Sequence, residues 1–103
     1  MTPKSLIEPA RHAGTALLRS QTDARLVDLT RDGNERAFEA IVQRYNRPLL
    51  RYCARILSPE RAEDAVQQAF LSAHRSIHAG DADLNLRPWL YRIAHNSALN
   101  ILR

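Results

Sequence analysis

The spacing of the apolar residues constrains the fold most, because they recur at intervals of three and four along three separate stretches of the chain. The stretches cover residues 35–57, 59–78 and 86–103. Their apolar positions are Phe38, Ile41, Val42, Tyr45, Leu49, Tyr52, Cys53 and Ile56, then Val66, Ala69, Phe70, Ala73 and Ile77, then Leu90, Ile93, Ala94 and Ile101. No segment alternates between apolar and polar residues as a half-buried strand does. The pattern predicts an all-α fold, a compact bundle of three long helices plus a short N-terminal helix.

Local start and stop signals separate these helices. Asp23 is expected to cap a short helix that continues through Thr30 and stops at Asp32-Gly33. Asn34 is expected to cap the next helix, and Ser58, followed by proline, to cap the one after it. The sequence thus divides into a loosely ordered tail over residues 1–22, or one short helix within it, and a helical domain over residues 23–103.

Two further positions bear on the helix boundaries. Pro48 lies inside the first long helix and is expected to kink or split it near residues 44–45, because proline removes one intrahelical hydrogen bond. Residues 79–85 lack periodicity and contain one glycine and two aspartates, which predicts a loop between the last two helices. Asn85 could cap the final helix.

The length and composition of the chain fit one small globular domain, and its net positive charge fits a mild preference for polyanions. The chain has 103 residues, of which 45% are hydrophobic and 25% charged, and its net charge is +4. The excess is uneven, since residues 35–57 and 84–103 each sum to +3 while residues 58–83 sum to −3. The single cysteine, Cys53, excludes an internal disulfide and is expected to be a small buried residue. No transmembrane run or secretory signal is present, so a cytoplasmic location without membrane insertion is expected.

One side of the last helix carries amides, arginines and an aromatic residue but no acid. At 100° per residue these cluster on an arc away from the core face, namely Trp89, Arg92, Asn96, Asn100 and Arg103. Asparagine is a poor helix former, so two of them one turn apart suggest specific contacts. Amides and arginines can contact bases or phosphates, and an aromatic ring can stack on an unpaired base. The residues alone leave a nucleic-acid surface and an ordinary polar surface equally open.

Other clusters admit simpler interpretations. Asp64, Gln67, Gln68 and Leu71 share a face that could dock a partner helix or simply face solvent, and Arg44, Arg47, Arg51 and Arg55 could track phosphates or be solvated. His74 and His78 have the spacing of two metal ligands, but no third ligand is evident near them, so no metal site or cofactor is predicted. No catalytic constellation is present, and the chain is not expected to be an enzyme.

Two motifs, considered together, resemble a known family. Residues 62–71 (AEDAVQQAFL) and 88–100 (PWLYRIAHNSALN), preceded by residues 33–39 (GNERAFE), resemble the first conserved domain, region 2, of ECF group RNA polymerase sigma factors. The resemblance covers residues 24–103. It implies a helical bundle whose acidic helix binds the clamp coiled coil of the polymerase through Asp64, Gln67 and Leu71. Gln68 stands at a polymerase-facing position where the family usually has glutamate.

The same resemblance assigns promoter melting at the minus-ten element to the last helix and the loop before it. Asn96 and Asn100 are implied to contact bases or backbone of the non-template strand, Trp89 to support the melting surface, and the loop to hold an extruded base. The expected DNA-binding residues are Asp81, Asp83, Asn85, Arg87, Trp89, Arg92, Asn96, Asn100 and Arg103. The loop lacks the aromatic residue that many members place at or near Gly80.

The predicted function is a transcription initiation module with core polymerase and promoter DNA as partners and an anti-sigma factor as a further partner. The alternative is a sigma-like interaction module that mainly binds an anti-sigma regulator, which an exposed apolar strip on residues 38–57 would support. The sequence stops at Arg103, before the linker and helix-turn-helix domain of such factors. We therefore expect a first domain alone, either as a fragment of a longer factor or as a natural short form.

Overall fold

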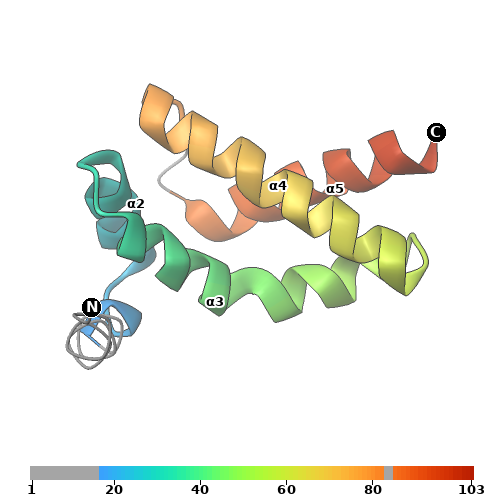
Figure 1. The fold of residues 1–103 in the computed structure, drawn as a ribbon, viewed down its shortest axis with the longest axis horizontal. Helices are drawn as coiled ribbons and strands as arrows, with labels where there is room; N and C mark the ends of the chain where they lie inside the picture. Colours follow the sequence, from blue (N-terminus) through green and yellow to red (C-terminus); the bar gives the residue numbers. More distant parts are fainter. Residues whose placement is uncertain (1–16, 83–84) are drawn as a thin grey trace, which may run out of the picture.

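The computed structural model describes residues 17–82 and 85–103, and within these ranges every regular element is a helix. The order is α2 (Asp23–Arg31), α3 (Glu35–Cys53), α4 (Pro59–Ala79) and α5 (Leu86–Leu102). Figure 1 shows α3 and α4 side by side, α5 behind α4, and α2 across one end of the bundle. The predicted all-α class is confirmed. No helix in the described ranges is long and apolar enough to cross a membrane.

Local chemistry explains most of the helix boundaries. The side chain of Asn34 accepts hydrogen bonds from the backbone N–H groups of Arg36 and Ala37, so the predicted cap of α3 is confirmed. Ser58 caps α4 by accepting from the N–H of Arg61, and Pro59 follows at the first helical position.

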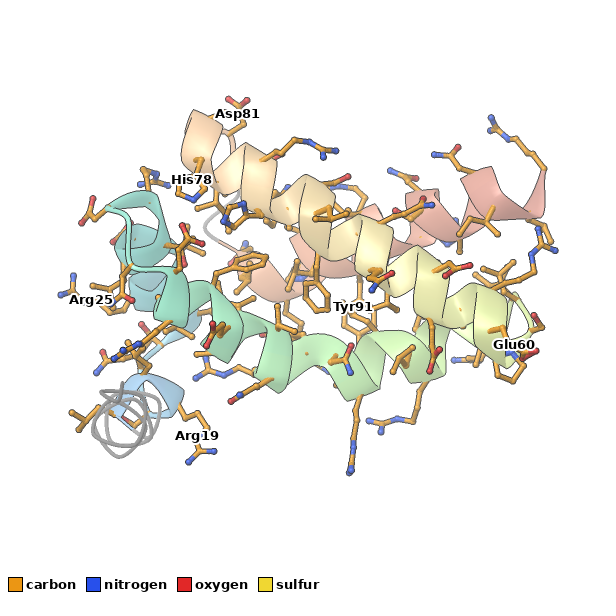
Figure 2. All side chains as sticks on the ribbon, in the orientation of Figure 1. Arg19, Arg25, Glu60, His78, Asp81 and Tyr91 are labelled. Atoms are coloured by element: carbon orange, nitrogen blue, oxygen red, sulfur yellow. The ribbon has the colours of Figure 1, made fainter. Side chains whose placement is uncertain are left out.

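The C-terminus of α4 is closed by Gly80, which adopts the left-handed conformation at φ 82°. The N–H of Asp81 donates to the carbonyl of Ser76 at 2.8 Å, and the N–H of Gly80 to that of Ile77 at 3.1 Å. These two bonds form a Schellman motif, which satisfies carbonyls that the end of a helix would otherwise leave without partners. Figure 2 shows His78 and Asp81 at this end of α4 and Glu60 at the other.

Three expected boundaries differ from the structure. The cap of α2 is Thr22, whose side chain accepts from the N–H of Arg25, and α2 ends at Arg31. The first long helix ends at Cys53, because residues 54–57 close into turns whose hydrogen bonds reach back three or four residues, and buried Leu57 anchors them. Asn85 occupies the position before α5 but makes no capping hydrogen bond with its side chain.

The expected split at Pro48 does not occur. The helix α3 continues through Pro48 as one element from Glu35 to Cys53. Tyr45, Leu49 and Cys53 are buried on the same face on both sides of the proline, at 4%, 0% and 0% exposure. Their packing against the core stabilises the helix where proline removes a backbone donor.

Small side chains along α4 bring the helices together. Its alanines at positions 62, 65, 69 and 73 are all buried, and α3 and α5 contribute further buried alanines at positions 37 and 40 and at positions 94 and 98. Small residues at a helix contact permit a short distance between the axes. Larger side chains fill the remaining core, among them Leu26, Ile41, Leu49, Ile77, Leu86 and Leu90.

A polar cluster fixes the start of α2 to the middle of α3. The Asp23 carboxylate accepts hydrogen bonds from Arg44 at 2.7 Å and from the Tyr45 hydroxyl at 2.5 Å. Arg44 also donates to the backbone carbonyls of Arg19 and Gln21, at 2.8 Å each. Its guanidinium therefore has a structural role, and the interpretation of Arg44 as part of a phosphate-tracking face is wrong.

The Tyr45→Phe variant tests this cluster through its pH dependence. Burial, reinforced by the hydrogen bond to the Asp23 carboxylate, raises the pKa of Tyr45 from 10.0 to about 12. Between these values the unfolded chain gives up the phenol proton and the folded chain retains it, so the free energy of unfolding falls as pH rises from 10 to about 12. We expect Tyr45→Phe to lower that free energy by about 1–3 kcal/mol at pH 7 and to reduce its fall above pH 10. Urea unfolding across this pH range measures both, and parallel pH profiles for the two proteins would contradict the assignment.

Candidate functional site

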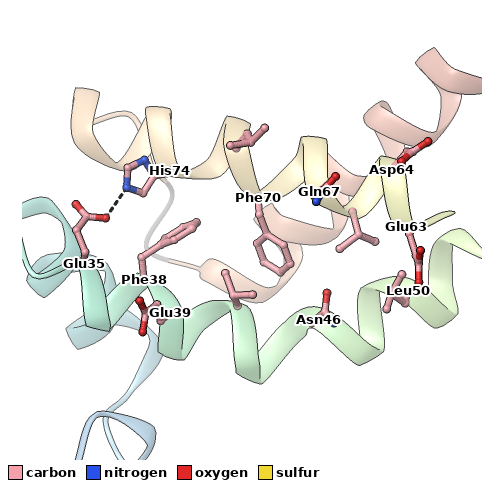
Figure 3. Close-up of a pocket in the computed structure, with 13 residues that line it drawn as sticks. Glu35, Phe38, Glu39, Asn46, Leu50, Glu63, Asp64, Gln67, Phe70 and His74 are labelled. Carbon is pink, nitrogen blue, oxygen red and sulfur yellow. Dashed lines mark hydrogen bonds and ion pairs between the residues drawn. The ribbon is translucent and has the colours of Figure 1, made fainter. Parts of the chain in front are cut away.

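A groove runs along the contact between α3 and α4. Phe38 and Phe70 point toward one another within it, with their ring centroids 6.3 Å apart in an edge-to-face arrangement (Figure 3). The described lining residues are Glu35, Phe38, Glu39, Val42, Asn46 and Leu50 from α3, and Glu63, Asp64, Val66, Gln67, Phe70, Leu71 and His74 from α4. The groove thus has an apolar floor between two polar rims.

The rims of the groove are acidic. Four carboxylates line it, those of Glu35, Glu39, Glu63 and Asp64, and no lysine or arginine is among the described lining residues. Leu71, which is 60% exposed, adds a large apolar side chain at the edge. An apolar strip bordered by acids suits a partner helix that is apolar on one face and basic at its margins.

Most of the predicted polymerase-facing residues come together here. Asp64, Gln67 and Leu71 line the groove, whereas Gln68 is exposed but does not line it. The sequence analysis missed Glu39, since α3 as a whole is basic and its carboxylates were not associated with the acidic helix. It also left Glu63 of α4 out of the predicted docking face. Phe38, Val42 and Leu50 of α3 are half-buried, so the exposed apolar strip on residues 38–57 that would support the alternative function is only partly present.

A second surface lies on α5. Arg87, Arg92, Asn96, Asn100 and Arg103 are all exposed, and α5 contains no acidic residue. The Arg87 guanidinium lies 5.5 Å from the centroid of the Tyr91 ring, a cation–π contact that orients it. This exposed face has the chemistry of a nucleic-acid surface, with amide groups and arginines and no competing carboxylate.

Trp89 does not share that surface. It is only 7% exposed and belongs to the core, together with Leu86 and Leu90 of the same turn. The angle of 100° per residue predicts an exposed Trp89 only if every turn of the helix is buried on the same face. The beginning of α5 lies at the end of the bundle that α2 covers, so more of its circumference is buried there (Figure 1). A stacking role for Trp89 on the exposed face is therefore wrong.

The loop before α5 is described only in part. Asp81 is exposed directly after the end of α4, and Asn85 is exposed directly before α5. Asp83 lies outside the described residues. A hydrogen bond of 2.8 Å between the Tyr52 hydroxyl and Nδ1 of His95 connects α3 to α5.

Comparison with known proteins decides the family. The family model described as sigma-70 region 2 matches residues 41–103, more than half of the chain. The chain belongs to the sigma-70 region 2 family. Both motifs that suggested the ECF sigma factors lie within the matched residues.

Curated relatives of this region 2 domain are RNA polymerase sigma factors. It is 37% identical over 81 residues to the ECF RNA polymerase sigma-E factor of Haemophilus influenzae, and 36% identical over 81 residues to that of Escherichia coli K12. It is 34% identical over 87 residues to the RNA polymerase sigma-H factor of Pseudomonas aeruginosa. The alignments cover 79%, 79% and 84% of this chain, but 43%, 42% and 45% of the relatives, in the same order. The chain therefore spans less than half the length of these relatives.

A solved structure has the same fold. The NMR structure of an engineered region 2 of sigmaE in complex with GTAAAA is 36% identical in sequence and superposes with a TM-score of 0.73. The match covers 80% of this chain and 86% of that one. The resemblance to region 2 of ECF sigma factors is confirmed.

The burial of Trp89 in this region 2 domain leads to a stability prediction. We expect Trp89→Ala to lower the free energy of unfolding by about 3–5 kcal/mol, because a large aromatic side chain is removed from the core. Asn96→Ala, at an exposed position of the same helix, should change it by no more than about 0.5 kcal/mol. Urea unfolding followed by circular dichroism measures both variants, and equal stability of the two would show that Trp89 is on the surface.

Proposed function

We propose that this domain is a transcription initiation module that binds core RNA polymerase and engages the minus-ten element of promoter DNA. The observation that carries the proposal is the presence of two surfaces of opposite character on one small bundle. The groove between α3 and α4 has four carboxylates and no lysine or arginine, while α5 carries arginines and asparagines and no acid. Membership of the sigma-70 region 2 family supports this pairing of a protein partner with DNA, since sigma factors are initiation factors rather than enzymes.

The groove is the proposed polymerase surface. A helix of the clamp coiled coil would place apolar side chains between Phe38 and Leu71 and basic ones against Asp64 and the neighbouring glutamates. Gln67 would add hydrogen bonds at the rim. Gln68, which does not line the groove, would make at most a peripheral contact.

The exposed face of α5 is the proposed DNA surface. Asn96 and Asn100 lie one turn apart, so their amides can reach successive groups along an extended single strand. Arginines and the absence of carboxylates favour the phosphate backbone. The related region 2 structure is a complex with the oligonucleotide GTAAAA, which supports recognition of an unpaired strand by this fold. We further propose that Asp81 and Asn85, which are exposed at the two ends of the preceding loop, contact an extruded base.

An anti-sigma regulator is the second candidate partner. Phe38, Val42 and Leu50 are half-buried rather than covered, and Leu71 is largely exposed, so the groove offers the apolar strip that a regulatory helix would need. A regulator bound there would compete directly with the polymerase. A cytoplasmic location is part of this proposal, because the proposed polymerase partner acts there.

Replacing Asn96 and Asn100 together by alanine tests the DNA surface. We expect affinity for a fluorescent single-stranded GTAAAA oligonucleotide to fall about tenfold or more, because each lost amide removes contacts worth about 1–3 kcal/mol. Gln43→Ala, which removes an exposed amide from α3, is the matched control and should bind normally. Fluorescence anisotropy measures the affinities, and normal binding by the double variant would exclude the proposed role of α5.

Replacing Asp64 by alanine tests the groove. We expect its affinity for core polymerase to fall about three- to thirtyfold, because a rim carboxylate opposite a basic partner is lost. Glu60→Ala is the control, since Glu60 is exposed in the first turn of α4 and does not line the groove (Figure 2). Binding to immobilised polymerase gives the comparison, with oligonucleotide binding unchanged in both variants. An equal loss in the two variants would indicate a general charge effect and not a groove contact.

A further inference from the structure

Three potential metal ligands converge where the beginning of α3 meets the end of α4. His74 Nε2 lies 2.8 Å from Oε1 of Glu35, and His78 Nε2 lies 3.3 Å from Oε2 of the same carboxylate. The two imidazole nitrogens are 3.2 Å apart. Figure 3 shows Glu35 and His74 facing one another across the end of the groove. The sequence revealed the two histidines, but it gave no indication of Glu35, which is 39 residues away from His74.

The three side chains can present their lone pairs to one point. Each ring nitrogen carries at most one proton, and a neutral imidazole has one donor and one acceptor nitrogen. Without a metal ion, Nε2 of His74 can donate to the Glu35 carboxylate and to Nε2 of His78. When both rings are protonated at Nδ1, the two Nε2 atoms and the carboxylate each offer a lone pair to one cation.

The spacing matches a tetrahedral metal ion. Zinc bound at about 2.0–2.1 Å separates its ligand atoms by roughly 3.3 Å, close to the observed 2.8, 3.3 and 3.2 Å. All three ligand atoms lie within 4.8 Å of one another.

The rings are also held in place before any ion binds. His74 packs edge-on against Phe38, with ring centroids 4.7 Å apart, and against His78 at 4.4 Å. Glu35 is the first residue of α3, directly after the Asn34 cap, so its backbone is fixed. The side chains of Glu35, His74 and His78 are 59%, 34% and 36% exposed, which lets an ion enter without unfolding.

We propose that Glu35, His74 and His78 form a binding site for a divalent transition-metal ion of the zinc type. Two imidazoles and one carboxylate are a donor set that zinc accepts, with a fourth position open to water or to a partner's side chain. Magnesium and calcium are disfavoured because they require six or more ligands, nearly all oxygen. The bound ion would clamp α3 to α4 at one end of the groove, since Glu35 and His74 also line it.

Direct metal titration tests the site. We expect the 103-residue protein to bind one Zn²⁺ by isothermal titration calorimetry, and Co²⁺ to give the intense visible absorption of a tetrahedral site. Glu35→Gln and His78→Gln should each weaken binding by at least about tenfold, since even outer-shell changes weaken metal sites tenfold or more. Glu39→Gln is the matched control, because Glu39 is exposed one turn along α3 and is not part of the cluster. It should leave the affinity unchanged.

Thermal unfolding gives a second readout. With free Zn²⁺ tenfold above the Kd of the native protein, we expect Tm to rise by about 5 °C or more in the native and Glu39→Gln proteins, and by no more than about 3 °C in Glu35→Gln and His78→Gln. No binding at millimolar Zn²⁺, or equal binding by native and Glu35→Gln proteins, would overturn the proposal. Neither measurement involves polymerase or DNA, so the result is independent of the function proposed above.

Discussion

The close approach of α4 to its neighbours is the constraint on which the rest of the structure depends. Its buried alanines allow α3 and α5 to pack on two sides of one helix, so that α4 takes part in most of the core. A larger residue at these positions would separate the helices and open the core. The same packing leaves the outer face of α4 exposed, and Asp64 and Gln67 lie on that face at the edge of the groove.

The two proposed surfaces are a consequence of this arrangement. The small residues of α5 pack against the other helices. Its asparagines and arginines lie on the opposite side of the helix and are exposed. The groove forms along the contact of α3 with α4, where Phe38 is only half-buried and packs edge-to-face on the buried Phe70. A protein partner and a nucleic acid can therefore be contacted by different helices of one small domain.

Local chemistry made much of the fold predictable, and contacts distant in sequence explain where prediction failed. The caps at Asn34 and Ser58 involve neighbours within three residues, so the sequence reveals them directly, and Gly80 lies within the predicted loop of residues 79–85. The burial of Trp89 depends on how α2 covers the end of the bundle. The hydrogen bond from Arg44 to Asp23 joins residues that are 21 positions apart in the sequence. The approach of Glu35 to the histidines of α4 depends on the fold in the same way. Asp64 and Asn96 were identified by family resemblance, because their polar faces alone are like those of any surface helix.

Gly80 limits how the loop between α4 and α5 can evolve. An added Cβ at this position would meet no atom within 4 Å, so space is available for a side chain. The restriction is torsional, because φ is 82° and a residue with a side chain adopts this conformation at a cost of about 1–2 kcal/mol. Substitutions that alter what the loop touches are therefore tolerated more readily after Gly80 than at Gly80 itself. The direction in which the chain leaves α4 stays constant, while the chemistry of the loop beyond it is free to diverge.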